Sequence, residues 1–135
     1  MKKIHLLILL SFTFLAVHAQ KKQSVENPEV YIFGVGTSFN DSTTYISEIH
    51  HFKGNFIEKK TGFLENRAIY AEQMKIYLEQ NYPGYETCAI FYDTKKKAIE
   101  KKYNKVRRRY QKDKSTKLVE LPVTEFTFNP VKSKQ

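Results

Sequence analysis

Residues 85–110 have the sequence YETCAIFYDTKKKAIEKKYNKVRRRY, which predicts a strand followed by a helix. Apolar side chains alternate over both faces of the first eight residues, as expected for a strand. After Asp93, a favourable residue for a helix N-cap, the apolar positions recur at spacings of four, three and four. These positions are Ile99, Tyr103, Val106 and Tyr110. At about 100° per residue they form one narrow stripe, which predicts a helix packed on a sheet.

The segment before this unit predicts a β-hairpin and a further helix. Residues 30–35 (VYIFGV) are apolar on both faces, which suits an interior strand. The turn residues NDS at 40–42 separate them from residues 43–50, a second strand rich in β-branched side chains. A helix is expected from Thr61 to about Gln80, because its apolar residues recur at helical spacing and NYPG follows.

The last expected strand covers residues 118–128 and is interrupted at Pro122. Because proline cannot donate to a ladder, this strand lies at an edge or splits in two. The resulting order is β-β-α-β-α-β. We therefore predict an α+β fold, a two-layer sandwich of about four strands with two helices on one face. A chain of 135 residues allows one domain, expected at residues 29–128 with a loose tail at 129–135.

The first 19 residues predict a secretory signal peptide. Lys2 and Lys3 precede an apolar run, and VHA at 17–19 fits a small-x-Ala cleavage site. The run is shorter than the ~20 residues that a membrane-spanning helix needs, which disfavours an anchor. No cysteine lies near the cleavage point. We expect an exported protein, periplasmic or secreted, that is not a lipoprotein and keeps no transmembrane segment after cleavage; residues 20–28 are a flexible lead-in.

Most of the positive charge lies in one segment. The formal charge is +9, and loss of Lys2 and Lys3 with the signal peptide lowers it to +7. Residues 95–117 contain twelve Lys/Arg and two acids, a net charge of +10, so the rest of the mature chain is slightly acidic. Such a charge bears on partners and solubility rather than on the fold.

One side of this basic helix is a candidate anion-binding face. Its members lie opposite the apolar stripe and include like-charge pairs four residues apart, each of which costs an isolated helix about 0.2–0.5 kcal/mol. They are Lys97, Lys101, Lys105, Arg108 and Lys112. They predict weak, salt-sensitive binding of an anionic envelope surface or an acidic protein. The alternative is a solvated face without a partner. Export, and a stripe whose tyrosines pack in the core, disfavour nucleic acid.

Elsewhere the sequence offers no specific catalytic or metal-binding motif. His50 and His51 point to opposite faces of a strand, and Glu48 with His50 would supply only two metal ligands. Cys88 lies between apolar neighbours and is expected in the core. The GVGT run at 34–37 lacks the context of a phosphate loop, and its glycines are expected at a bend or bulge. We therefore expect no cofactor and no metal.

Three stretches of the sequence, taken together, resemble a known group of proteins. They are VYIFGVGTSFNDSTTYISEI at 30–49, EKKTGFLENR at 58–67 and YETCAIFYDTKKKAIEKKY at 85–103. Together they resemble small exported proteins of unknown function from Bacteroidota-type bacteria. The resemblance covers most of residues 30–128 and implies a secreted or periplasmic α+β domain without an assigned reaction.

A shorter motif depends on this resemblance. Asp41-Ser42-Thr43 is similar to the Asp-Ser/Thr-X tripeptide that such bacteria O-glycosylate on exported proteins. The resemblance implies a candidate O-glycosylation site at Ser42. The alternative is a plain hairpin turn.

The sequence therefore favours an exported, non-enzymatic domain that binds an anionic envelope partner through its basic helix. Two alternatives stay open. A small periplasmic enzyme with a site assembled only in three dimensions would be favoured by a pocket joining Glu48, His50 and another polar group. An assembly or structural subunit would be favoured by an exposed strand edge or apolar patch at residues 123–128.

Overall fold

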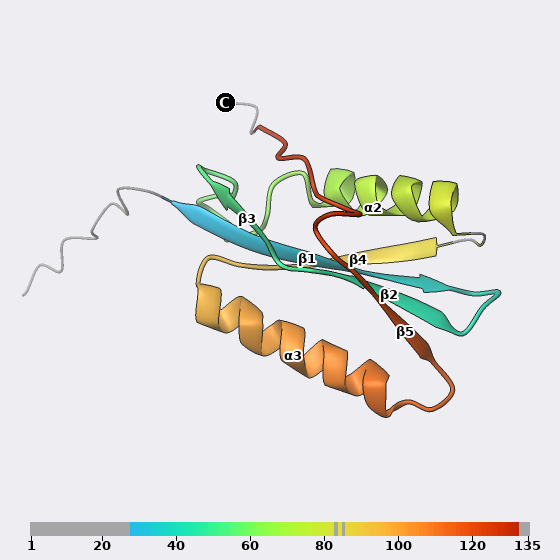
Figure 1. Cartoon of the computed structure of the whole chain (residues 1–135). Helices are drawn as coiled ribbons and strands as arrows, with labels where there is room; N and C mark the ends of the chain where they lie inside the picture. Colours follow the sequence, from blue (N-terminus) through green and yellow to red (C-terminus); the bar gives the residue numbers. More distant parts are fainter. Residues whose placement is uncertain (1–27, 83, 85, 133–135) are drawn as a thin grey trace, which may run out of the picture.

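The computed structural model describes residues 28–82, 84 and 86–132, so the expected signal peptide and residues 20–27 of the lead-in lie outside the described residues. The described chain forms a mixed sheet with two helices (Figure 1). The strands are β1 (Glu29–Ser38), β2 (Thr43–Ser47), β3 (His50–Lys53), β4 (Glu86–Asp93) and β5 (Lys117–Leu121), and the helices are α2 (Arg67–Asn81) and α3 (Lys96–Lys112). The predicted α+β sandwich of a sheet and helices is confirmed, with five strands instead of about four.

The extra strand arises because the predicted second strand bends. β4 pairs along one side of β1, while β2 and β3 pair antiparallel with successive halves of its other side. Between them, Glu48 leaves the β1 ladder and its N–H donates to the carbonyl of Leu121. β5 pairs with β2 in parallel and ends at Leu121, directly before Pro122. This agrees with the prediction that the proline confines the last strand to an edge.

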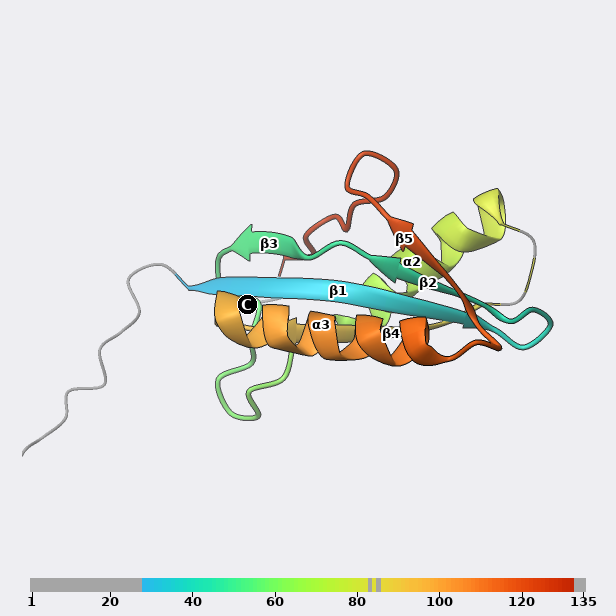
Figure 2. The same cartoon turned by 60° about the horizontal axis from the view of Figure 1, so that its bottom comes forward.

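The two helices lie on opposite faces of the sheet, and the prediction that they share one face is wrong (Figures 1 and 2). Val30 and Ile32 of β1 belong to one buried cluster with residues of α2, which we call the α2-side cluster. Phe33 and Val35 belong to a second cluster with Ile99 of α3, the α3-side cluster. The physical reason is that β1 is apolar on both faces, so each face needs its own cover.

The helices keep their predicted apolar faces but start later than expected. α2 begins at Arg67 rather than at Thr61, because the preceding residues form turns and an isolated bridge between Ile57 and Leu64. Its buried side chains recur every four residues, in agreement with the predicted helical spacing: Tyr70, Met74 and Leu78. Asp93 is not the N-cap of α3, which is Lys95; the Asp93 Oδ1 instead accepts a hydrogen bond from the Lys95 N–H at 3.0 Å, before the helix begins at Lys96.

The chain after β5 is tied to α2, which corrects the expectation of a loose tail from residue 129. Phe126 and Phe128 are buried in the α2-side cluster. The Asn129 N–H donates to Gln73 Oε1 at 2.8 Å, and the Val131 N–H donates to the Tyr70 hydroxyl at 3.0 Å. Residues 133–135 lie outside the described residues. The segment 122–131 is therefore part of the core packing as far as Val131.

His50 lies under this C-terminal segment. Its side chain is buried, its Nε2 donates to the Phe126 carbonyl at 3.3 Å, and its ring lies nearly perpendicular to those of Phe126 and Phe128. Burial lowers the pKa of His50 below its ordinary value, although the Phe126 and Glu48 carbonyls act in the opposite direction. The fold therefore favours the neutral imidazole.

Stability should consequently fall in acid through His50. The unfolded chain binds a proton at its ordinary pKa of about 6.5, whereas the folded chain does so only at lower pH. We expect full stability above about pH 6.5 and a decline below it, at most about 1.4 kcal/mol per pH unit. Urea unfolding at stepped pH measures this decline. His50→Gln should reduce it, while His51→Gln, on the opposite face, should retain it; equal curves for both variants would contradict this role of His50.

Candidate functional site

The apolar side of α3 fixes the helix on the sheet. Ile99 is fully buried, and Tyr103, Val106 and Tyr110 pack against the α3-side cluster. The Tyr103 ring meets Phe33 of β1 edge-on, with centroids 5.2 Å apart. The predicted stripe thus faces the sheet, and its two tyrosines pack against the core while remaining half-buried.

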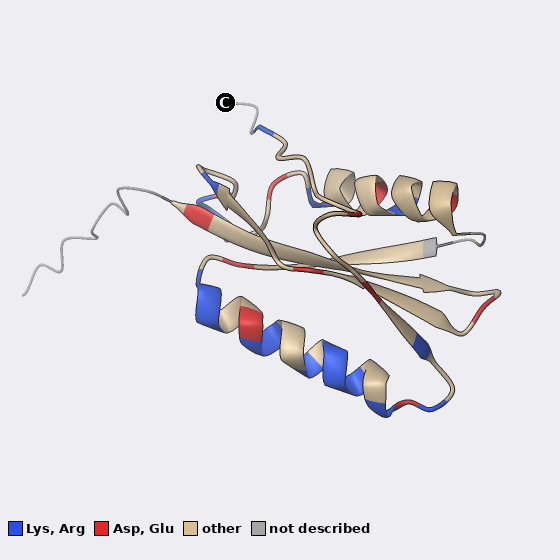
Figure 3. Cartoon of the chain, in the orientation of Figure 1, with Lys and Arg blue, Asp and Glu red and all other residues tan. Residues whose placement is uncertain are grey.

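The opposite side of α3 carries the candidate anion-binding residues, and Figure 3 shows how much of this helix consists of Lys and Arg. All five predicted side chains are exposed: Lys97, Lys101, Lys105, Arg108 and Lys112. Within residues 28–132, as far as the structure describes them, none of the five makes an ion pair. The structure therefore brings the five predicted residues together on one exposed face, which we call the basic face.

Two other cations of α3 hold the helix to the sheet edges. Lys102 Nζ donates to Asp93 Oδ2 at 3.0 Å and to the Tyr92 carbonyl at 3.1 Å, both at the end of β4. Arg107 makes an ion pair with Glu120 of β5. Partial burial tends to raise the pKa of Asp93, but hydrogen bonds from Lys95 and Lys102 and the Lys102 charge outweigh it and lower the pKa. These cations position the basic face rather than belong to it.

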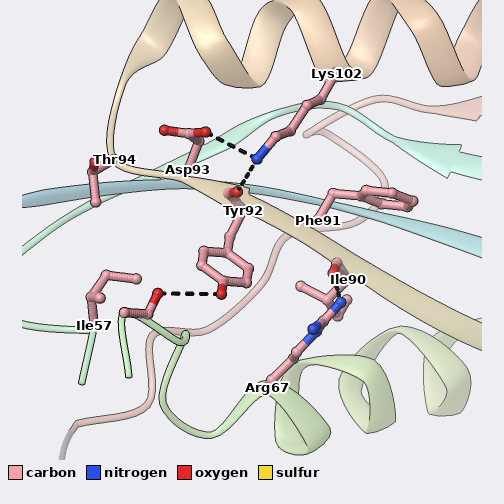
Figure 4. A pocket seen from close by; sticks show the side chains of 9 residues that line it. Ile57, Arg67, Ile90, Phe91, Tyr92, Asp93, Thr94 and Lys102 are labelled. Atoms are coloured by element: carbon pink, nitrogen blue, oxygen red, sulfur yellow. Dashed lines mark hydrogen bonds and ion pairs between the residues drawn. The ribbon is translucent and has the colours of Figure 1, made fainter. Parts of the chain in front are cut away.

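A pocket of about 340 Å³ lies beside Lys102 at the free edge of β4 (Figure 4). Arg67 Nη2 donates to the Ile90 carbonyl at 2.8 Å, and its guanidinium lies 5.7 Å from the centre of the Tyr92 ring. The Tyr92 hydroxyl donates to the Gly62 carbonyl at 3.3 Å. The polar groups of the pocket thus bind one another, and two cations cover carbonyls of an edge strand. Such cover protects an edge against pairing with another chain.

A larger hollow of about 1280 Å³ follows α3 itself. Its lining includes all five residues of the basic face and the half-buried side chains of Val106 and Tyr110. The one lining residue from outside the helix is Phe91 of β4. Sequence reasoning missed Phe91 as a site residue, although the alternation of β4 already placed it on the face opposite Ile90.

The other residues considered for catalysis or metal binding lie apart from one another. His50 and His51 face opposite sides, as predicted: His50 is buried, while the half-exposed His51 stacks on Tyr31 and pairs with Glu29 at 3.4 Å. Glu48 Oε2 accepts a hydrogen bond from the Val123 N–H, which ties it to the chain after β5. No group of three or more His, Cys, Asp or Glu that could hold a metal ion occurs among the described residues.

The structure also locates Cys88 and residues 123–128, which bear on the alternatives of an enzyme and of an assembly or structural subunit. Cys88 is half-buried and packs against the α2-side cluster, consistent with a core residue. In residues 123–128 the aromatic side chains are buried, and Val123 is the exposed large apolar residue. Over the part of the chain that the structure describes, no helix has the length and apolar character needed to cross a bilayer.

Ser42 lies in the turn between β1 and β2, where residues 39–42 are all exposed. Its carbonyl accepts a hydrogen bond from the Lys117 N–H, and Asp41 Oδ1 accepts bonds from the N–H and hydroxyl of Thr43. The Ser42 side chain is thus accessible on a turn held by its neighbours. Its O-glycosylation stays a prediction.

Comparisons of the chain with protein-family models, with curated proteins and with solved structures found no match. The functional argument therefore rests on the surface of α3.

Proposed function

We propose that this protein is an exported, non-enzymatic domain that docks on an anionic partner of the cell envelope through the basic face. The observation that carries this proposal is five exposed cations on one side of a helix whose other side is anchored in the core. Export itself follows from the signal-peptide prediction for residues 1–19.

Physical chemistry favours a partner for such a face. Like charges at positions 97, 101 and 105 repel one another along the helix, and an anionic surface would relieve that repulsion. Exposed charges interact over about one Debye length, roughly 8–10 Å at physiological ionic strength, so the attraction weakens as salt rises. A partner held by these residues should therefore dissociate at high salt.

The proposal predicts a site-specific loss of polyanion binding. Replacing Lys101, Lys105 and Arg108 together with glutamine should weaken heparin binding about 10-fold or more at moderate salt, since each cation near an anionic surface contributes about 1 kcal/mol. Heparin-affinity elution and titration calorimetry over a salt series measure the affinity and its salt dependence.

A second triple variant separates the basic face from net charge. Lys53, Lys59 and Lys60 are exposed cations outside α3, so their replacement by glutamine removes the same charge. We expect this control to retain most of the affinity. Equal losses in both triple variants would show that binding follows net charge, and the proposed function would then be wrong.

A further inference from the structure

We propose that the partner is an anionic amphiphile, one apolar chain with an acidic head, bound in the hollow where α3 lies over β4. This inference rests on the proposed function, because it assigns the ligand class of the same helix. It adds that the ligand needs an apolar part and that one flank of α3 binds it.

The floor of the hollow is apolar. Phe91, Val106 and Tyr110 line it, and all three are only half-buried by the α3-side cluster. Phe91 is the cross-strand partner of Phe33, and the two rings stack with centroids 4.8 Å apart. This contact with a buried side chain fixes the position of the Phe91 ring. A ligand that covers these side chains would remove apolar surface from water.

The floor continues along β4. Ala89 is the cross-strand partner of Val35, which belongs to the α3-side cluster, so both lie on the same face of the sheet. Ala89 is nevertheless exposed, as is Thr87 two residues before it. The sheet face on which α3 lies is therefore uncovered at Ala89 and Thr87, beside the hollow.

One flank of α3 carries cations along this floor. Lys102 contacts the end of β4, whereas Arg107 contacts β5, so the two flanks of the helix face different edge strands. Lys105 and Arg109 follow Lys102 at spacings of three and four residues and therefore share its flank. Both line the hollow, and no ion pair involves either one within the described residues. They are placed to bind an acidic head above the apolar floor.

Two other kinds of partner fit the hollow less well. A hydrophilic polyanion would neutralise the cations but leave Phe91 and Val106 in water. An extended peptide would need the free edge of β4, where Arg67 and Lys102 already bind the carbonyls of Ile90 and Tyr92. An anionic amphiphile is complementary to both the floor and the rim.

The test uses dodecanoate below its critical micelle concentration, with the mature chain and two-dimensional NMR at neutral pH. We expect saturable shifts at Phe91, Val106 and Tyr110. Acetate, with the same head, should produce no such shifts at equal concentration. Dodecyltrimethylammonium, with the same chain and a cationic head, should bind at least 10-fold more weakly.

Matched variants locate the site. Replacing Lys105 and Arg109 with glutamine should weaken dodecanoate binding about 10-fold, whereas replacing Lys95 and Lys96, which are exposed at the start of the same helix and do not line the hollow, should weaken it less than 3-fold. Ala89→Glu adds an acid at an exposed position beside the floor and should weaken binding as strongly as the Lys105/Arg109 pair.

Dodecanoate binding no tighter than that of acetate would overturn this inference, as would equal losses in the two double variants. Binding of phosphatidylglycerol vesicles without binding of dodecanoate would also overturn it and indicate a membrane surface instead. Site-specific heparin binding in either case would leave the proposed function standing, because the heparin experiment tests the cations alone.

Discussion

Replacing Phe128 with alanine should lower the free energy of unfolding by about 3–5 kcal/mol. The ring is 3% exposed and packs with its edge or face against Phe126, His50 and Tyr70, with centroid distances of 4.8, 5.1 and 6.1 Å. The substitution removes this apolar contact and leaves a cavity between α2 and the sheet. Urea unfolding followed by circular dichroism measures the difference.

Phe39→Ala is the matched control. The same substitution in the exposed turn after β1 removes a ring that is 86% exposed, so we expect a change within about 0.5 kcal/mol. If Phe128→Ala also remained within 1 kcal/mol of the parent, the segment after β5 would not contribute to the core as the structure shows.

The position of Phe128 is also a feature that the sequence pattern could not predict. Residues 118–128 have a strand-like composition, and Pro122 correctly indicated an interruption. The pattern could not show that Phe126 and Phe128 leave the sheet edge and cross to the α2 side. That path depends on long-range partners, among them His50 and Tyr70, which periodicity does not report.

The placement of the helices was indicated by the sequence but interpreted incorrectly. Val30 and Ile32 alternate with Phe33 and Val35, so β1 is apolar on both faces. A strand of this kind needs cover on both sides, and two helices with one apolar face each are enough only if they lie on opposite faces. The apolar residues on both faces of β1 therefore indicated one helix on each face of the sheet, as the structure shows.

The candidate site, too, could be predicted from the sequence only in part. Helical periodicity alone placed Lys97, Lys101 and Arg108 on an outer face, because the apolar stripe fixes which side of α3 meets the sheet. It could not assign Lys102 to the β4 flank or bring Phe91 beneath the helix, since both depend on which strands lie under α3.

Gly34→Val should destabilise the fold by about 3 kcal/mol, because Met74 of α2 packs directly over this residue. A Cβ on Gly34 would overlap Met74 Sδ and come within 3.1 Å of Phe128 Cζ and 3.3 Å of Ile90 Cδ1. The backbone cannot easily yield, since β1 is paired on both sides and the Gly34 N–H donates to the buried Ser47 hydroxyl at 2.8 Å. This glycine thus permits close helix packing and does not form the expected bend or bulge.

A double-mutant cycle tests the cause of that loss. Gly34→Ala alone should cost about 1–3 kcal/mol through overpacking, and Met74→Ala alone about 2–5 kcal/mol through loss of a buried side chain. Met74→Ala also removes the sulfur that a Cβ at position 34 would overlap, so the double variant should be more stable than the sum of the single effects implies, by about 1 kcal/mol or more. Urea unfolding of the four proteins gives this coupling. Additive effects would mean that the glycine acts through the strand backbone, and the close approach of α2 to β1 would then not explain why residue 34 has no side chain.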